Sequence, residues 1–206
     1  LSLPSDLGYS DEGYALPPME VRYHKLPSNN SGVLDKDGQL LLQRDAAEGL
    51  TAAAREKRES LDARVTEMKR IVDASPGEHF ILWHDLEAER HAIKAALPEA
   101  VEVYGSLDLE EREKRVVDFS EGRTRLLATK KEISGSGCNF QRHCHRAVFL
   151  GIDYKFNDFI QAIHRIYRFL QTEKVVIDII YTENESEILA ELLEKWKRHD
   201  DQAEKM

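Results

Sequence analysis

The sequence has little of what secreted and membrane proteins depend on. It contains only two cysteines in 206 residues, Cys138 and Cys144, so a disulfide framework is not expected and a reducing, intracellular setting is favoured. Its apolar runs are short, such as VVIDIIY at 175–181, and none approaches the ~20 apolar residues of a membrane span. No signal peptide is visible and the first residue is Leu, which leads us to expect a fragment of a longer chain.

The sequence also lacks an excess of positive charge. It has 29 Lys and Arg against 38 Asp and Glu, for a net charge of −9, which is not typical of a free-standing nucleic-acid-binding protein. The charges are unevenly distributed, however. Many basic residues lie in 112–146 and 155–174, whereas 1–20 and 183–206 hold much of the acid. The composition therefore leaves room for a local basic surface.

Two signatures of nucleoside triphosphate binding are missing. No G-x-x-x-x-G-K-[ST] pattern occurs, so the chain has no Walker A loop. No D-E-x-H or D-E-A-D tetrapeptide occurs either, and the nearest stretch, DEGY at 11–14, does not fit.

The first third of the chain divides into an irregular part and a helix. Residues 1–47 are rich in Pro, Gly, Asn, Asp and Ser, which predicts turns and loops, with one short alternating strand at 19–26. From 48 to 74 the pattern becomes helical and ends at ASPGE. The apolar residues that form one stripe of this helix are Leu61, Val65, Met68 and Val72.

The rest of the chain alternates between strands and helices. Strands are predicted at 79–84, 100–105, 124–130, 145–151 and 174–182, and helices at 87–98, 108–122, 157–171 and 185–201. This alternation predicts an α/β fold with a parallel sheet and helices on both faces. Ligands of such sheets bind beyond the carboxyl ends of the strands. The loops concerned are 84–87, 104–108, 129–140 and 151–157.

A glycine-containing loop, 130–141, directly follows the predicted strand 124–130. Its Gly135 and Gly137 permit close approach of the backbone to a ligand, and short polar side chains accompany them. These polar residues are Thr129, Ser134, Ser136 and Asn139. Such a loop can present amides and hydroxyls to phosphate oxygens, although a plain connection between two strands explains it equally well.

Cysteine and histidine gather just after this loop. Zinc uses such ligands, but structural zinc sites usually take two spaced pairs, whereas here three of the candidates are adjacent. Adjacent residues that enter a strand point to alternate faces, so no metal site is predicted. The candidates are Cys138, His143, Cys144 and His145, with His164 further along.

The segment QAIHRIYRFLQ at 161–171 carries a second candidate site. In a helix, the spacings of four and three residues place Gln161, Arg165 and Arg168 on one face. No acidic residue occurs between Asp158 and Glu173. An arginine pair without a nearby carboxylate suits a bidentate anion such as phosphate, while the alternative is an ordinary solvated face.

Taken together, these segments resemble superfamily-two helicases and translocases, with the Swi/Snf-type DNA translocases the most similar. LLATKKEISGSGCNFQ (126–141) is similar to motif V, and QAIHRIYRFLQ (161–171) to motif VI. YGSLDLEEREKRVVDFSEG (104–122) and HFILWHD (79–85) resemble two further family segments, the latter motif IV. Four motifs in the family order, over residues 78–182, are far more specific than any one of them.

The resemblance implies the second RecA-like lobe of a two-domain motor. It implies a linker or edge segment at 1–47, a helical addition at 48–76 and the lobe itself at 77–206. Arg165 and Arg168 would be arginine fingers at the γ-phosphate. Gln161, Gly137 and Asn139 would complete the nucleotide site. The residues expected to bind nucleic acid are Gly105, Ser106, Thr129, Lys130, Ser134 and Gly135.

The partners also follow from the resemblance. ATP with Mg²⁺ would be held mainly by the missing first lobe, so this chain alone would not hydrolyse ATP. DNA, duplex more than single strand, and the N-terminal RecA-like lobe of the same protein are the expected partners. Three departures from the family pattern stand out. His164 replaces an Asp, Leu170 replaces a Gly, and the motif V loop is one residue longer.

Three other functions remain open. One is an RNA helicase lobe of the same superfamily. Another is a RecA-like binding or scaffold module without turnover, against which the intact Arg165 and Arg168 argue. The last is a small phosphate-binding enzyme that stands alone, for which only His84, Asp85, His143 and His145 offer catalytic groups.

Overall fold

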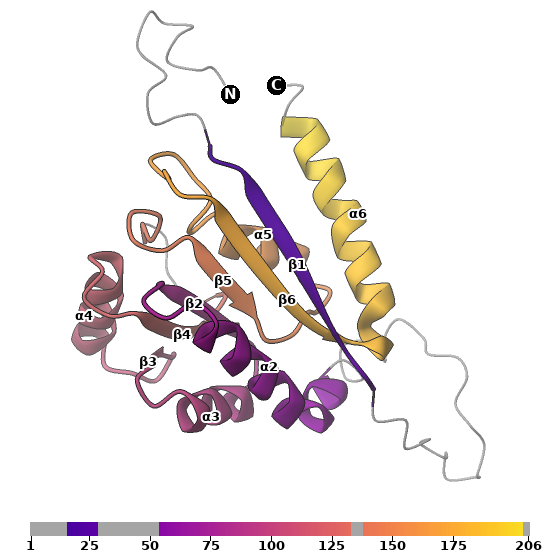
Figure 1. Cartoon of the computed structure of the whole chain (residues 1–206), viewed down its shortest axis with the longest axis horizontal. Helices are drawn as coiled ribbons and strands as arrows, with labels where there is room; N and C mark the ends of the chain where they lie inside the picture. Colours follow the sequence, from indigo (N-terminus) through magenta and orange to yellow (C-terminus); the bar gives the residue numbers. More distant parts are fainter. Residues whose placement is uncertain (1–15, 29–53, 133–137, 204–206) are drawn as a thin grey trace, which may run out of the picture.

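The protein is built on a six-stranded parallel sheet with helices on both faces (Figure 1). A computed structural model describes residues 16–28, 54–132 and 138–203. The strands follow the order β1-β6-β5-β2-β4-β3 across the sheet. Their bounds are β1 Met19–Leu26, β2 Phe80–His84, β3 Val101–Val103, β4 Leu126–Lys130, β5 Arg146–Phe149 and β6 Val175–Thr182.

The helices connect these parallel strands. Their bounds are α2 Leu61–Asp73, α3 Glu87–Ala96, α4 Leu109–Ser120, α5 Phe156–Ile163 and α6 Ser186–Ala203, with a 3₁₀ turn, η2, at Glu183–Glu185. A short helical segment at 54–59 precedes α2. Within the described ranges, no helix is long and apolar enough to cross a membrane. The predicted α/β class with a parallel sheet is therefore confirmed.

The sheet has a separate core on each face, because the side chains of a strand alternate between the two faces. In β2, Ile81 and Trp83 join the core under α4, α5 and α6. Phe80 and Leu82 join the core under α2 and α3. Figure 1 shows α2 and α3 in front of the sheet and α5 and α6 on its other side. Coverage of both faces explains why the strands read as continuous apolar runs.

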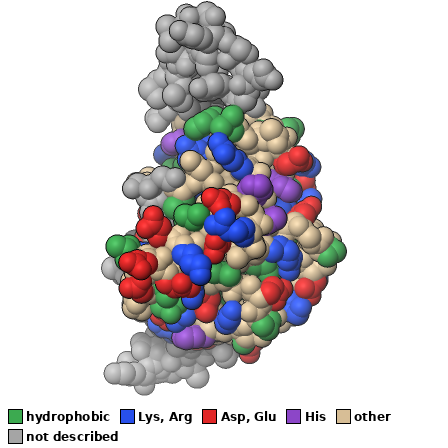
Figure 2. Space-filling view, turned by 90° about the vertical axis from the view of Figure 1, so that its left-hand side faces the viewer, with side chains coloured by type: hydrophobic (Ala, Val, Ile, Leu, Met, Phe, Trp, Pro, Cys, Tyr) green, Lys and Arg blue, Asp and Glu red, His purple; other side chains and the backbone are tan. Residues whose placement is uncertain are grey.

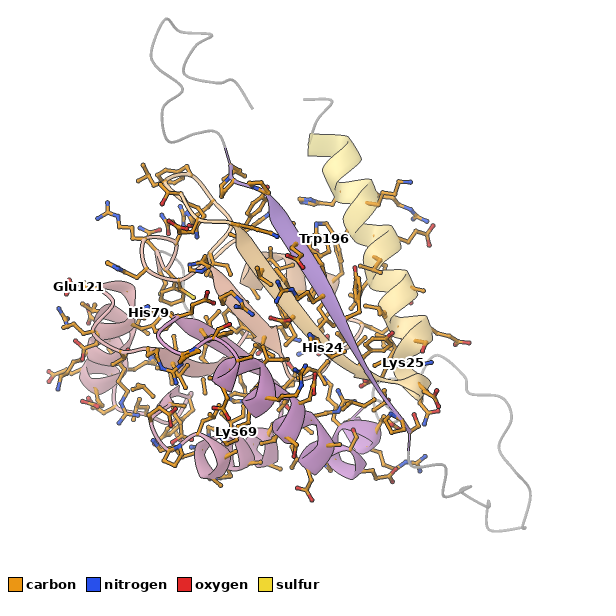
Figure 3. The ribbon with its side chains drawn as sticks, in the orientation of Figure 1. His24, Lys25, Lys69, His79, Glu121 and Trp196 are labelled. Carbon is orange, nitrogen blue, oxygen red and sulfur yellow. The ribbon has the colours of Figure 1, made fainter. Side chains whose placement is uncertain are left out.

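Strand β1 belongs to the same sheet. It pairs in parallel with β6, from Met19 opposite Val175 to Leu26 opposite Thr182. His24 of β1 also links the sheet to α2 (Figure 3), since its Nδ1 lies 2.7 Å from Glu67 Oε1 and its Nε2 lies 2.8 Å from Asp178 Oδ1. The hydrogen bond with Asp178, joined by that with Glu67, raises the pKa of His24 against the effect of burial. The proposed boundaries at residues 47 and 76 stay predictions.

The predicted helix at 157–171 is wrong at its carboxyl end. Helix α5 stops at Ile163, and residues 164–170 form consecutive turns. The amides of Arg165 and Ile166 bond to carbonyls three residues back, which tightens the last turn. The carbonyl of Arg165 accepts a hydrogen bond from the amide of Phe140, so a neighbouring segment occupies a group that a longer helix would use. The apolar spacing continues beyond Ile163, but tertiary contacts end the helix there.

Candidate nucleotide and nucleic-acid sites

Residues 164–171, which we name the arginine turn, lie at the edge of the sheet where the strands begin. Helix α5 follows β5 and leads the chain back to the start of β6, because β5 and β6 are parallel. The arginine turn therefore lies at the amino edge, opposite the edge at which this fold class usually binds ligands. The sequence could have predicted this position, because a helix between two parallel strands returns the chain to the edge where the strands begin.

Contacts with the segment 138–144 hold the arginine turn in place. The amide of Phe140 donates to the carbonyl of Arg165 at 3.3 Å. The side-chain amide of Gln141 donates to the carbonyl of Phe169 at 3.3 Å. The buried Gln171 donates to the carbonyls of Cys144 and Ile166 at 3.1 and 3.0 Å. The sequence pattern contained both glutamines but did not reveal that they connect the two motifs.

The two predicted arginine fingers are half-buried and have no carboxylate within ion-pair distance in the described ranges. The Arg168 guanidinium lies 4.9 Å from the centre of the Phe169 ring. Burial raises the pKa of the Cys138 thiol, and the positive charge of the nearby Arg165 partly opposes this rise. By contrast, Arg90 and Arg146 each pair with two carboxylates, Arg90 with Glu87 and Glu102 and Arg146 with Glu78 and Asp178. The arginine turn thus offers two cations suited to an anion.

The other predicted nucleotide-binding residues lie near this edge where they are described. Asn139 is exposed and adjoins Phe140, whose amide contacts Arg165. Gln161 is exposed in the last turn of α5. Gly137 falls outside the described residues. The structure therefore brings Asn139, Arg165 and Arg168 to one edge of the sheet.

The predicted nucleic-acid-binding residues that the structure describes lie at the opposite, carboxyl edge. Gly105 and Ser106 are exposed just after β3. Lys130 ends β4 and its Nζ lies 3.2 Å from Glu87 Oε1. Thr129 is fully buried, and its hydroxyl lies 3.5 Å from the carbonyl of Lys130. The other two predicted residues, Ser134 and Gly135, lie outside the described ranges.

Four charged residues, three of them buried and one, Asp85, partly buried, lie at the same carboxyl edge, and the sequence did not single them out as a group. Lys57 pairs with Asp85 and, at 4.0 Å, with Asp153. Lys131 Nζ lies 2.9 Å from Asp85 Oδ1 and 3.3 Å from Asp153 Oδ2. We name these four residues the carboxyl-edge cluster. Asp85 and Lys131 directly follow β2 and β4, and Asp153 lies four residues after β5. Charged residues just beyond the carboxyl ends of predicted parallel strands were therefore the available signal in the sequence.

The carboxyl-edge cluster shifts the pKa values of Asp85 and Lys131 in the directions that favour their charged forms. Burial disfavours the charge of Asp85, but Lys131 and Lys57 outweigh it and hold the pKa of Asp85 well below its usual value. Burial likewise disfavours the charge of Lys131, but Asp85 and Asp153 outweigh it and raise its pKa. The cluster thereby joins the helical segment 54–59 to the start of the glycine-containing loop.

His84, at the end of β2, is buried without a hydrogen-bond partner for either ring nitrogen in the described structure. Desolvation lowers its pKa to about 4, so the ring is neutral near neutral pH. At the opposite, amino edge, Cys144 is also buried and donates from Sγ to the carbonyl of Arg146 at 3.2 Å. Burial raises the pKa of Cys144 to about 12, as befits a packing residue.

Figure 2 shows the face that carries α4, where acidic and basic side chains are interspersed among the described residues. Neighbouring charges of opposite sign pair there, as Arg115 does with Glu111 and Arg123 with Asp118. This face is therefore not the source of a local basic surface.

Comparison with known proteins finds similar structures but no similar sequences. No family model matches the sequence, and no curated protein resembles it in sequence. The C-terminal part of the Fun30 ATPase domain matches 62% of this chain at 15% identity with a TM-score of 0.53, and this chain covers 43% of it. The C-terminal domain of the DEAD-box protein Dbp5 matches 65% at 18% identity with a TM-score of 0.55, and 78% of it is covered.

A third similar structure is domain 2 of the DEAD-box helicase Mss116p bound to an RNA duplex. It matches 65% of this chain at 16% identity, with a TM-score of 0.54 and 54% of its own length covered. The chain thus has the fold of a helicase C-terminal RecA-like domain. It spans less than half of the Fun30 chain to which it is similar.

Proposed function

We propose that this chain is the C-terminal motor lobe of an ATP-dependent DNA helicase or translocase of the Swi/Snf type. One observation carries the proposal. A turn fixed by three sets of hydrogen bonds presents Arg165 and Arg168 together, and neither has a carboxylate partner in the described ranges. Fixed guanidinium groups at a sheet edge suit a polyphosphate that another domain brings to that edge.

The arginine turn fits phosphate rather than a metal ion, because it carries two cations and the described residues hold no group of three or more potential metal ligands. ATP would supply the phosphoryl group and Mg²⁺ its charge neutralisation, both held mainly by the first lobe. In phosphoryl transfer, catalysis consists mostly of positioning and of stabilising charge on the transferred group. Arg165 and Arg168 perform that role here, Gln161 and Asn139 contact the nucleotide, and Gly137 lies in the same motif.

Nucleic acid would bind at the carboxyl edge. Gly105, Ser106 and Lys130 are the candidates among the described residues, and Ser134 and Gly135 of the motif V loop are candidates from the sequence alone. Thr129 is buried, so it would act through the backbone it supports rather than by direct contact. The nucleotide and the nucleic acid would then bind at opposite edges of the sheet. The segment 138–144, which contacts the arginine turn, would couple the two sites.

RNA is the second candidate activator. It is favoured by the similarity to Dbp5 and Mss116p, since one similar structure is a Dbp5 variant bound to RNA and ADP BeF3 and another is Mss116p domain 2 with an RNA duplex. The Fun30 similarity and the QAIHRIYRFLQ segment favour duplex DNA.

The test is the ATPase rate of the full-length protein and of this 206-residue chain, each with duplex DNA, with single-stranded RNA and without nucleic acid. A silent 206-residue chain beside a DNA-stimulated full-length protein supports the proposal. Stimulation by RNA alone would move the assignment to an RNA helicase lobe. A full-length protein that stays silent under all conditions would favour a scaffold module, and an active 206-residue chain would contradict the division into two lobes.

A further inference from the structure

Leu170 has a backbone conformation that leucine rarely adopts. Its φ is 66°, and no other described non-glycine residue has a positive φ. The amide of Gln171 donates to the carbonyl of Arg168 at 3.1 Å, so Leu170 is the third residue of a four-residue turn. Glycine or asparagine usually occupies such a position, because a larger side chain is strained there.

The fold does not explain why this position holds leucine. The Leu170 side chain is 42% exposed and belongs to neither of the two cores. The turn itself is held by backbone carbonyls and by the side chains of Gln141 and Gln171, and these contacts would hold glycine equally well. A strained residue that the surroundings enforce is a reason to look for a function.

The neighbours of Leu170 show the chemistry of the surface. Phe169 is 41% exposed, and the Arg168 guanidinium lies over its ring. Arg165 lies in the same turn. Aromatic, aliphatic and arginine side chains side by side are typical of the centre of a protein interface. A nucleic-acid backbone would gain nothing from leucine, because its contacts are with phosphate and sugar.

We propose that Phe169 and Leu170 are the apolar anchor by which the arginine turn docks on the nucleotide-bearing lobe of the same protein. The inference rests on the proposed function and names the partner of that site. A domain that brings a phosphate to Arg168 comes close to the next two residues, since they are consecutive in one turn and the Arg168 guanidinium lies over the Phe169 ring. Leu170 then loses exposed apolar area only in the closed arrangement of the lobes, and so favours that arrangement.

The experiment uses Leu170→Asn in the full-length protein. Asparagine tolerates a positive φ but removes the apolar group. Leu109→Asn is the matched control, because Leu109 is 64% exposed at the start of α4, at the opposite edge of the sheet. Closure of the lobes is followed by small-angle X-ray scattering during titration with ADP and beryllium fluoride. We expect the midpoint to move to about tenfold higher nucleotide for Leu170→Asn, the effect of exposing one leucine, and not for Leu109→Asn.

Thermal unfolding of the 206-residue chain supplies the second readout. The Tm of Leu170→Asn is expected to equal or exceed that of the wild type, since strain is relieved and little burial is lost. A clear fall in Tm would make Leu170 a packing residue and overturn the proposal. An unchanged closure midpoint for Leu170→Asn would also overturn the proposal. If sedimentation then showed that the substitution removes self-association, the surface would bind a second copy of the chain instead of the other lobe.

This outcome is separable from that of the proposed function. If Arg168→Ala retained normal turnover while Leu170→Asn still shifted closure, the finger assignment would fail and the docking surface would stand. If Arg168→Ala lost turnover while the closure midpoint of Leu170→Asn was unchanged, the finger assignment would stand and the docking surface would fail.

Discussion

The guanidinium of Arg168 has two features at the residue scale that fit a transferred phosphoryl group. It lies over the Phe169 ring, which restricts its orientation, and no carboxylate in the described ranges neutralises it. A cation prepared in this way stabilises charge without reorganising during the reaction. Arg168 is therefore the most informative residue to change.

Arg168→Ala in the full-length protein is expected to reduce ATP turnover by ~10³–10⁵, the share that an arginine finger supplies in related phosphoryl transfers. Nucleotide affinity should stay within severalfold, because in the proposed two-lobe motor the first lobe would provide most of the binding. Steady-state kinetics and equilibrium binding of a fluorescent nucleotide measure the two effects. Arg198→Ala is the control, since Arg198 is exposed on α6 and pairs only with Glu194 in the described contacts. Near-normal turnover of Arg168→Ala would remove the finger assignment.

His84 allows a pH-dependent prediction at the same scale. Its pKa is lowered by desolvation from 6.5 to about 4 in the folded chain, so between these values the unfolded chain binds more protons. His84 therefore has little effect on the free energy of unfolding above pH 6.5, and this free energy falls as the pH falls from 6.5 toward 4. The loss from this residue is about 2 kcal/mol at pH 5 relative to pH 8.

His84→Leu should remove that part of the loss. Neither ring nitrogen has a partner in the described structure, so leucine breaks no hydrogen bond. Urea unfolding at pH 5 and pH 8 measures the difference for both proteins. An equal loss of stability in wild type and variant would show that His84 does not titrate in this range.

The carboxyl-edge cluster is the clearest case at the scale of elements. Lys57 from the segment 54–59 and Lys131 after β4 together neutralise Asp85 and Asp153, which follow β2 and β5. Lys57→Met would leave two carboxylates with one ammonium. Breaking a buried ion pair in this way costs about 3–5 kcal/mol.

Lys57→Met is therefore expected to lower the free energy of unfolding at neutral pH by about 3 kcal/mol. Lys69→Met is the matched control. Lys69 also pairs with an aspartate, Asp73, but both side chains are about half exposed, and such a pair contributes less than about 1 kcal/mol. Chemical denaturation measures both variants. A similar small effect for the two would show that the cluster does not hold the loops together.

Strand β1 is the feature to test at the scale of the whole molecule. It pairs along its whole length with β6, and His24 contacts the buried Asp178 and Glu67. Removal of residues 1–28 would expose the edge of β6 and leave Asp178 with Arg146 as its remaining described partner. Exposed strand edges pair with other chains.

We expect the shortened chain to be aggregated or to unfold at a clearly lower Tm than the 206-residue chain. Size-exclusion chromatography and thermal unfolding provide the readouts. A monomeric shortened chain with an unchanged Tm would show that 19–26 is an appendage, in agreement with a boundary at residue 47. A loss of the fold would place β1 within the lobe.

The sequence by itself determined the class of the fold and the identity of the main candidate residues. Strand and helix periodicities are local properties, and so the alternation that specifies a covered parallel sheet could be read from them. The two arginines and the absence of acid around them were equally visible, because they lie within one short segment. Leu170 was noted as a departure, although its positive φ could not be predicted.

The tertiary structure decided where these groups lie. The end of α5 at Ile163 depends on hydrogen bonds from Phe140 and Gln141, which lie outside the helical pattern. Thr129 is buried because both faces of β4 are covered, which its short polar side chain did not reveal. The carboxyl-edge cluster joins residues up to 96 positions apart, from Lys57 to Asp153. Contacts between distant segments form only when the chain is folded, so no local pattern encodes them.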